Sequence, residues 1–242
     1  MTEEKNNSRM IFSCGGKGGV GKTTIISSII DYLIHTKTPY RAYDLDMGNK
    51  NVGSLSRYGN GNIEKLQLSG ENLDRVAEGA LKTGIAVCDL PAGAEDTFRQ
   101  WYLDIGYSLK GEGIGYTAVA TVNALRASVS TLIDWANFLQ DGVDYVVALN
   151  EAFGGKDNNF LIYREWDQTK KFRDAFQPVE VIFPARNELL QMQLEDRGIT
   201  PLTYEYTNYK RGIDSILARN RIKNMRDCEL RIWDEIKEYI LT

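Results

Sequence analysis

One glycine-rich segment near the start of the sequence restricts the fold more than any other. Cys14 to Thr24 has the sequence CGGKGGVGKTT; a short apolar run precedes it, and apolar residues at helical spacing follow from Lys22 to His35. Glycines let several backbone amides turn toward one anion, and a helix that begins at the end of the loop adds its own N-terminal amides. The segment therefore predicts a strand, a phosphate-binding loop and a helix, in that order.

The loop contains the pattern G-x-x-x-x-G-K-[ST], known as Walker A, over Gly16 to Thr23. In this pattern the Lys22 charge meets the β- and γ-phosphates of a nucleoside triphosphate, and the Thr23 hydroxyl binds Mg²⁺. The expected nucleotide-binding residues of the loop are Gly15, Gly16, Lys17, Gly18, Gly19, Val20, Gly21, Lys22, Thr23 and Thr24.

Short apolar runs alternate with amphipathic segments along the rest of the chain. This pattern predicts an α/β fold, a mostly parallel twisted sheet with helices on both faces. Together with the Walker A segment it indicates a three-layer P-loop NTPase fold. We expect one domain over residues 1–242, with a disordered lead-in at 1–8, irregular segments at 48–62 and 106–115, and C-terminal helices over 203–242. The expected strands are 9–14, 39–45, 63–68, 84–88, 116–122, 143–149 and 179–183, and the expected helices are 22–35, 71–81, 95–105, 124–139, 170–176 and most of the chain after Arg186, with a break near 198–201.

The composition narrows the classes of function. The 29 basic and 33 acidic residues give a net charge of -4, so a uniformly basic nucleic-acid binder is not expected. A local basic patch is still compatible with this net charge. One histidine and three scattered cysteines do not provide a disulfide framework or a cysteine-rich metal site. No stretch has the roughly 20 apolar residues of a spanning helix, and no apolar signal segment begins the sequence. A reducing, cytoplasmic location is expected.

The second lysine of the loop, Lys17, carries a family resemblance. Lys17 to Thr24 resembles the signature K-G-G-x-G-K-[ST], the deviant Walker A motif of the ParA/MinD ATPases. The resemblance implies an ATP-dependent homodimer in which Lys17 reaches the phosphates bound by the partner and acts there as a catalytic residue. Without the resemblance, Lys17 would be interpreted as a solvated loop lysine.

Two acidic segments match the same family. Asp44-Leu45-Asp46 ends a strand and resembles the D-x-D first switch, which implies that Asp46 positions the attacking water and that Asp44 belongs to the metal shell. The following Gly48 and Asn51 are more similar to the MinD branch than to the D-x-D-P-Q of partition ATPases. The residues alone would also fit an Asp-rich turn.

The second acidic segment ends the apolar run before Asp89. Asp89-Leu-Pro-Ala-Gly93 resembles the Walker B aspartate and the second switch, which implies that Asp89 holds Mg²⁺ through water and that the Gly93 amide senses the γ-phosphate. Cys88 is interpreted as a small buried apolar residue of the strand.

The nucleobase contacts are less constrained by sequence. Asn150 and Pro184 each follow an expected strand, at places where the family contacts adenine, and ordinary turn residues remain the alternative. The chain has no N-K-x-D guanine motif, and ATP with Mg²⁺ is implied by the resemblance.

The resemblance implies a dimerising ATPase that acts as a spatial switch, with slow hydrolysis in the absence of a stimulating partner protein. Non-specific DNA is the first choice of surface, as in plasmid partition or cargo positioning; a solvated charged face is the alternative. The basic residues that would bind DNA lie in the C-terminal segment and are Lys210, Arg211, Arg219, Arg221, Lys223 and Arg226.

Two other functions stay open. One is a MinD-like ATPase that attaches to a membrane through a C-terminal amphipathic helix, with Ile222, Met225, Ile232, Ile236 and Ile240 near one face; nearby acidic residues favour a helix docked on the core instead. The other is an ATP-binding module of low turnover that assembles or regulates a conjugation system or a surface organelle.

Overall fold

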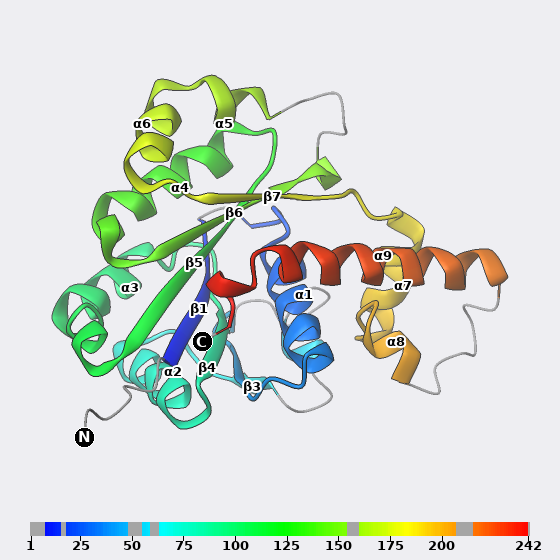
Figure 1. The fold of residues 1–242 in the computed structure, drawn as a ribbon, viewed down its shortest axis with the longest axis horizontal. Coiled ribbons are helices and arrows are strands. Elements are labelled where there is room, and N and C mark those ends of the chain that lie inside the picture. Colours follow the sequence, from blue (N-terminus) through cyan, green and yellow to red (C-terminus); the bar gives the residue numbers. More distant parts are fainter. Residues whose placement is uncertain are drawn as a thin grey trace.

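The computed structural model describes residues 8–15, 18–47, 55–58, 63–153, 160–206 and 215–241. Within them, seven parallel strands form one sheet in the order β3-β2-β4-β1-β5-β6-β7 (Figure 1). Residues 1–7 of the expected lead-in, and most of the segment 48–62, lie outside the described residues. Ser8, which was also expected in the disordered lead-in, is instead the buried first residue of β1, paired with Ile114 of β5. The strands are β1 (Ser8–Cys14), β2 (Arg41–Asp44), β3 (Ile63–Lys65), β4 (Ile85–Asp89), β5 (Ile114–Val122), β6 (Asp144–Asn150) and β7 (Val179–Phe183).

Helices cover both faces of the sheet (Figure 1). Side chains of β1 alternate between the faces: Met10 and Phe12 belong to one apolar cluster and Ile11 to the other. The first cluster packs against α2 to α6 and the second against α1 and α9. The helices are α1 (Lys22–His35), α2 (Gly70–Thr83), α3 (Glu95–Trp101), α4 (Arg126–Leu139), α5 (Leu161–Glu165), α6 (Asp167–Phe176), α7 (Glu188–Arg197), α8 (Thr203–Tyr206) and α9 (Ile216–Glu235).

Helix α9 packs across α1 (Figure 1). Trp233 of α9 is fully buried, and its indole N–H donates a 3.0 Å hydrogen bond to the hydroxyl of Ser28 in α1. A smaller apolar cluster joins α7, α8 and α9 through Leu190, Tyr204 and Ile222. The C-terminal helices are thus packed on the sheet domain.

The expected α/β architecture is confirmed, with local differences; for example, the strand expected over 63–68 ends at Lys65. The segment 106–115, expected to be irregular, contains a 3₁₀ turn at Ser108–Glu112 and the start of β5; Tyr116 fixes it by donating a hydrogen bond to the carbonyl of Gly106. The helix expected over 95–105 changes to π-type winding at Tyr102–Gly106. The short helix α5 was not predicted from the sequence.

Candidate nucleotide site

The phosphate loop leads from β1 into α1, as expected from the motif. Helix α1 begins at Lys22, directly after Gly21, whose φ of 99° lies in the left-handed region. Lys22 is 9% exposed. Gly16 and Lys17 lie outside the described residues. The described part of the loop therefore provides the helix N-terminus and the buried lysine that a phosphate site needs.

Thr23 and Asp89 meet beside this loop. The Thr23 hydroxyl donates a 2.6 Å hydrogen bond to Oδ2 of Asp89, and the Ser13 hydroxyl donates one of 2.8 Å to Oδ1. Burial raises the pKa of Asp89 to about 6, while the two hydroxyls and the nearby Lys22 charge act in the opposite direction. A hydroxyl and a carboxylate at contact distance are the oxygen ligands that Mg²⁺ accepts, directly or through water. The two residues thus fit the metal expected at this place.

Ser13 is a site residue that the sequence analysis missed. It is 1% exposed, and its Oγ also accepts a 2.8 Å hydrogen bond from the backbone N–H of Leu90. Ser13 therefore fixes both the Asp89 carboxylate and the first residue after β4. A polar residue near the end of an otherwise apolar strand was the available signal.

Asp44 lies at the end of β2, in register with Asp89 on β4. It is fully buried, and both carboxylate oxygens accept backbone N–H groups: Oδ1 from Asp46 at 3.1 Å and Oδ2 from Ser56 at 2.9 Å. These bonds hold the chain that leaves β2 against the turn at Leu55–Arg57. Asp46 is half-buried, and Gly93, in the loop after β4, has a φ of 80°.

Asn150 supports the phosphate loop from β6. Its Nδ2 donates a 2.9 Å hydrogen bond to the carbonyl of Val20, and its Oδ1 accepts one of 3.0 Å from the N–H of Ala152. A Cβ at Gly21 would come within 2.5 Å of Nδ2. The structure thus gives Asn150 a contact with the loop that the strand-end position alone did not predict.

A cavity of about 330 Å³ opens beside the loop. Its walls mix polar groups with small and apolar side chains, as nucleoside pockets do. Asn150 and Pro184, the residues expected near the base, both line it. The lining includes Gly21, Thr24, Asn150, Pro184, Arg186 and Met192.

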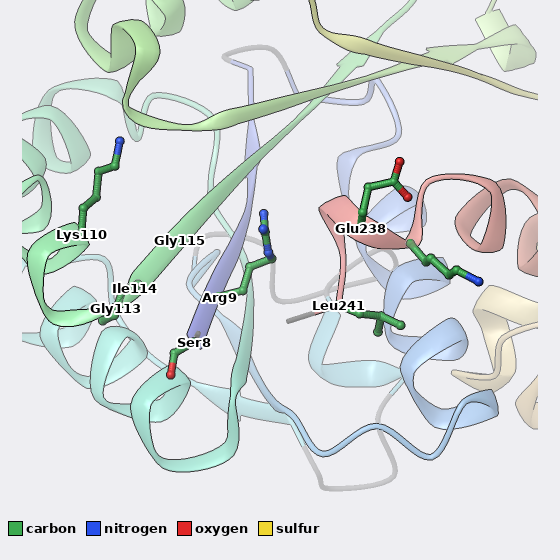
Figure 2. A pocket seen from close by; sticks show the side chains of 9 residues that line it. Ser8, Arg9, Lys110, Gly113, Ile114, Gly115, Glu238 and Leu241 are labelled. Carbon is green, nitrogen blue, oxygen red and sulfur yellow. The ribbon is translucent and has the colours of Figure 1, made fainter. Parts of the chain in front are cut away.

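A larger hollow of about 730 Å³ lies at the amino-terminal end of the central strands β1 and β5 (Figure 2). Arg9 of β1, Lys110 and the C-terminal turn with Glu238 and Leu241 line it. Arg9 pairs with Asp144 at 2.7 Å and so ties β1 to β6. This hollow is wide and lies at the amino ends of the strands, away from the phosphate loop, so its size does not make it the nucleotide site.

The C-terminal residues with apolar side chains are mostly docked on the core. Ile222, Ile236 and Ile240 are 1%, 7% and 0% exposed. In the part of the chain that the structure describes, no helix combines the length and apolar character needed to cross a bilayer. Met225 and Ile232 are partly buried against the same clusters, so the residues named for membrane attachment are wholly or partly occupied by packing.

The candidate DNA-binding residues separate into groups. Lys210 and Arg211 lie outside the described residues. Arg219, Arg221 and Lys223 are exposed on α9, while the Arg226 side chain is 14% exposed and pairs with Asp227 at 2.6 Å. Positions 219 and 223 lie one helical turn apart on one side, and 221 does not share that side. The described basic residues do not form a single stripe.

Comparisons with known proteins agree with this arrangement. No protein-family model matches the sequence, and no curated protein matches it. Among solved structures, the MinD cell division protein of Aquifex aeolicus is similar, with a TM-score of 0.51 and 18% identity over 91% of this chain and 96% of that one. A nucleotide-binding protein in complex with ADP, from Archaeoglobus fulgidus, has a TM-score of 0.50 and 18% identity over 84% of this chain and 90% of that one. The chain therefore has the α/β P-loop NTPase fold that MinD also has.

Proposed function

We propose that this chain is a single-domain ATPase of the ParA/MinD type that dimerises around Mg²⁺ and ATP and separates on hydrolysis. The observation that carries the proposal is the meeting of Thr23 and Asp89, 2.6 Å apart, beside the glycine loop and the buried Lys22. Together they provide the hydroxyl, carboxylate and cation that a P-loop site directs at Mg²⁺ and phosphate. The adjoining cavity has room for a nucleoside.

Two residues have roles that rest on the motif resemblance. Asp46 positions the attacking water; its half-buried place, two residues after the buried Asp44, is compatible with that role. Lys17 acts on the phosphates of the partner subunit. Turnover by the isolated protein is slow, and a partner protein stimulates it.

The exposed and buried side chains of the C-terminal segment favour DNA over a membrane as the surface that the dimer binds. Burial of Ile222, Ile236 and Ile240 disfavours insertion of this segment into lipid, because those side chains would first have to leave the core. Arg219 and Lys223, exposed on one side of α9, are compatible with an anionic polymer, and we propose non-specific DNA, with plasmid or cargo positioning as the role.

Light scattering of the protein with ADP and with ATP, in the presence of Mg²⁺, tests the dimer model. The mass should double with ATP and not with ADP, Asp46→Ala should keep the dimer with little phosphate release, and Lys17→Ala should bind nucleotide as a monomer. Lys22→Ala is the control for loss of binding. Equal dimerisation by the wild type and Lys17→Ala would contradict the role of Lys17.

The rate of ATP hydrolysis distinguishes the proposed switch from a static assembly module that binds ATP with low turnover. Phosphate release at saturating ATP should rise when DNA and a stimulating partner are added. Release that stays at background with every addition would support the low-turnover alternative over the switch.

A further inference from the structure

Helix α7 forms one wall of the cavity beside the phosphate loop. Gln191 and Met192 line the cavity, and Met192 is 53% exposed at that wall. Leu190 and Leu194 pack on the other side of the helix, in the cluster shared with α8 and α9. The position of this wall therefore depends on contacts with the C-terminal helices.

A buried ion pair fixes the start of α7. Arg186 donates a 2.8 Å hydrogen bond from Nη1 to Oε1 of Gln191, and its Nη2 lies 2.8 Å from Oε1 of Glu229 in α9. The Arg186 and Glu229 side chains are 11% and 5% exposed. Because Arg186 also lines the cavity, the pair joins the pocket wall directly to α9.

A second buried contact fixes the chain just after α7. The Thr200 hydroxyl donates a 2.8 Å hydrogen bond to Oδ1 of Asp31, and the backbone N–H of Leu202 donates one of 3.3 Å to Oδ2. Asp31 belongs to α1, the helix that begins at the phosphate loop. Polar contacts at both ends therefore hold α7 between α9 and α1.

Glu229 supplies the charge that keeps the Arg186 guanidinium in place. Among the described residues the buried Nε and Nη2 atoms of Arg186 make no hydrogen bond of good geometry, so Nη2 is held by the charge of Glu229. The other contacts of the guanidinium are the Nη1 hydrogen bond to Gln191 and the ring of Phe183, whose centroid lies 5.6 Å away. A buried cation that loses its carboxylate partner moves or recruits another group, because burial without compensation is costly. A change at Glu229 should therefore shift Arg186, then Gln191 and the wall.

We infer that Glu229 is a positioning residue for the nucleoside pocket, acting through Arg186 and α7, so that affinity for the base and ribose depends on the packing of α9. The inference rests on the proposed nucleotide site. Glu229 does not itself line the cavity, and among the described contacts it pairs with Arg186 rather than with the phosphate loop. Its removal should weaken the binding of the nucleoside while leaving the binding of the phosphates intact.

The test compares two ligands that share the phosphate chain: ATP and inorganic tripolyphosphate, each with Mg²⁺. Glu229→Gln keeps the shape of the side chain and removes its charge; it should weaken ATP binding about fivefold and leave tripolyphosphate binding unchanged. Asp234→Asn is the matched control, since Asp234 is also an α9 carboxylate that contacts α1, through a 3.2 Å hydrogen bond from Tyr32. It should change neither affinity.

The pocket wall is tested with two exposed residues of α7. Met192→Ala should weaken ATP binding alone, whereas Leu189→Ala, at a residue 59% exposed that does not line the cavity, should have no effect. Should Glu229→Gln prove unstable, Arg186→Met combined with Glu229→Leu removes both buried charges together and should still lower ATP affinity selectively.

Other outcomes separate this inference from the proposed function. Equal ATP affinity in wild type and Glu229→Gln, a parallel loss of both ligands, or the same loss in Asp234→Asn would each overturn the positioning role. A wild-type protein that binds neither ligand would contradict the nucleotide site itself.

Discussion

The hydroxyl of Thr23 lies 2.6 Å from Oδ2 of Asp89, which joins the first turn of α1 to the end of β4. The two residues are 66 positions apart in sequence. Ser13 holds the other carboxylate oxygen, so the Asp89 side chain is oriented before any metal binds. Such orientation lowers the cost of forming a metal site.

Thr23→Val tests this arrangement, because it removes the hydroxyl and keeps the shape of the side chain. We expect Mg²⁺ to raise the ATP affinity of the wild type, and this gain to fall about tenfold or more in the variant. Titrations of ATP with Mg²⁺ and with EDTA measure it. Thr23→Ser keeps a hydroxyl and should retain most of the gain; an unchanged Mg²⁺ effect in Thr23→Val would exclude Thr23 as a ligand.

Gly21→Ala should disturb the contact between the loop and β6. The added Cβ would lie 2.5 Å from Nδ2 of Asn150, at a φ of 99° that alanine rarely adopts. We expect a loss of about 1–3 kcal/mol in the free energy of unfolding without nucleotide, together with weaker ATP binding.

Gly18→Ala is the matched control for stability. A Cβ at Gly18 meets no atom within 4 Å. Its free energy of unfolding in denaturant, measured without nucleotide, should stay within about 0.5 kcal/mol of the wild type. Equal stability of the Gly21 and Gly18 variants would show that the loop is not held by Asn150.

Asp31 should make stability depend on pH. Burial raises its pKa from 3.8 to about 8, with Glu229 adding to the increase and Arg186 and the Thr200 hydroxyl opposing it. Between these two pKa values the folded protein holds a proton that the unfolded chain has released. This contribution is fully present below about pH 4 and is lost as the pH rises toward about 8, with a slope of at most about 1.4 kcal/mol per pH unit.

Asp31→Asn measures this contribution. Its amide can donate to Oγ1 of Thr200 and accept from Leu202, so the variant should fold. Denaturant titrations between about pH 5 and about pH 8 should show a shallower fall in stability than the wild type. Glu229, whose pKa burial also raises, stays in both proteins, so the difference between the two profiles reports the titration of Asp31 together with its coupling to Glu229. Identical pH profiles would mean that Asp31 titrates normally.

Binding of the ATP-loaded protein to unrelated DNA duplexes should weaken with salt. Replacing Arg219 and Lys223 together with glutamate should lower the affinity and the salt slope, because they lie on one side of α9. Arg221→Glu, on a different side, tests which side faces the DNA. Arg226 should contribute less because it pairs with Asp227. A wild-type protein with no salt-sensitive affinity would contradict DNA as the surface.

The phosphate loop and the pair formed by Thr23 and Asp89 could be predicted from sequence. The loop is one continuous segment, and parallel strands bring their carboxyl ends to the same edge of a sheet. Helix α1 has the bounds expected from its apolar spacing, Lys22–His35. The family resemblance, applied to their strand-end positions, predicts that Asn150 and Pro184 lie near the base; both line the cavity, and a contact with the base stays a prediction.

Contacts between segments that are distant in the sequence could not be predicted, because no local pattern indicates them. Met10 and Ile11 are adjacent apolar residues that point to opposite faces of β1, so they indicate that the strand is covered on both faces. No local feature indicates that Ser13 contacts Asp89. The segment 106–115 has the glycines of a loop, yet Tyr116 orders it from the neighbouring strand.

The amino-acid sequence by itself determined the phosphate loop, the order of strands and helices along the chain and the chemistry at the strand ends, because these depend on spacing within short segments. Only the tertiary structure decided that Asn150 supports the loop, that α7 forms the pocket wall and that Glu229 holds Arg186 behind it. Those contacts arise when the sheet order and helix packing bring residues together across large sequence separations, which local periodicity does not specify.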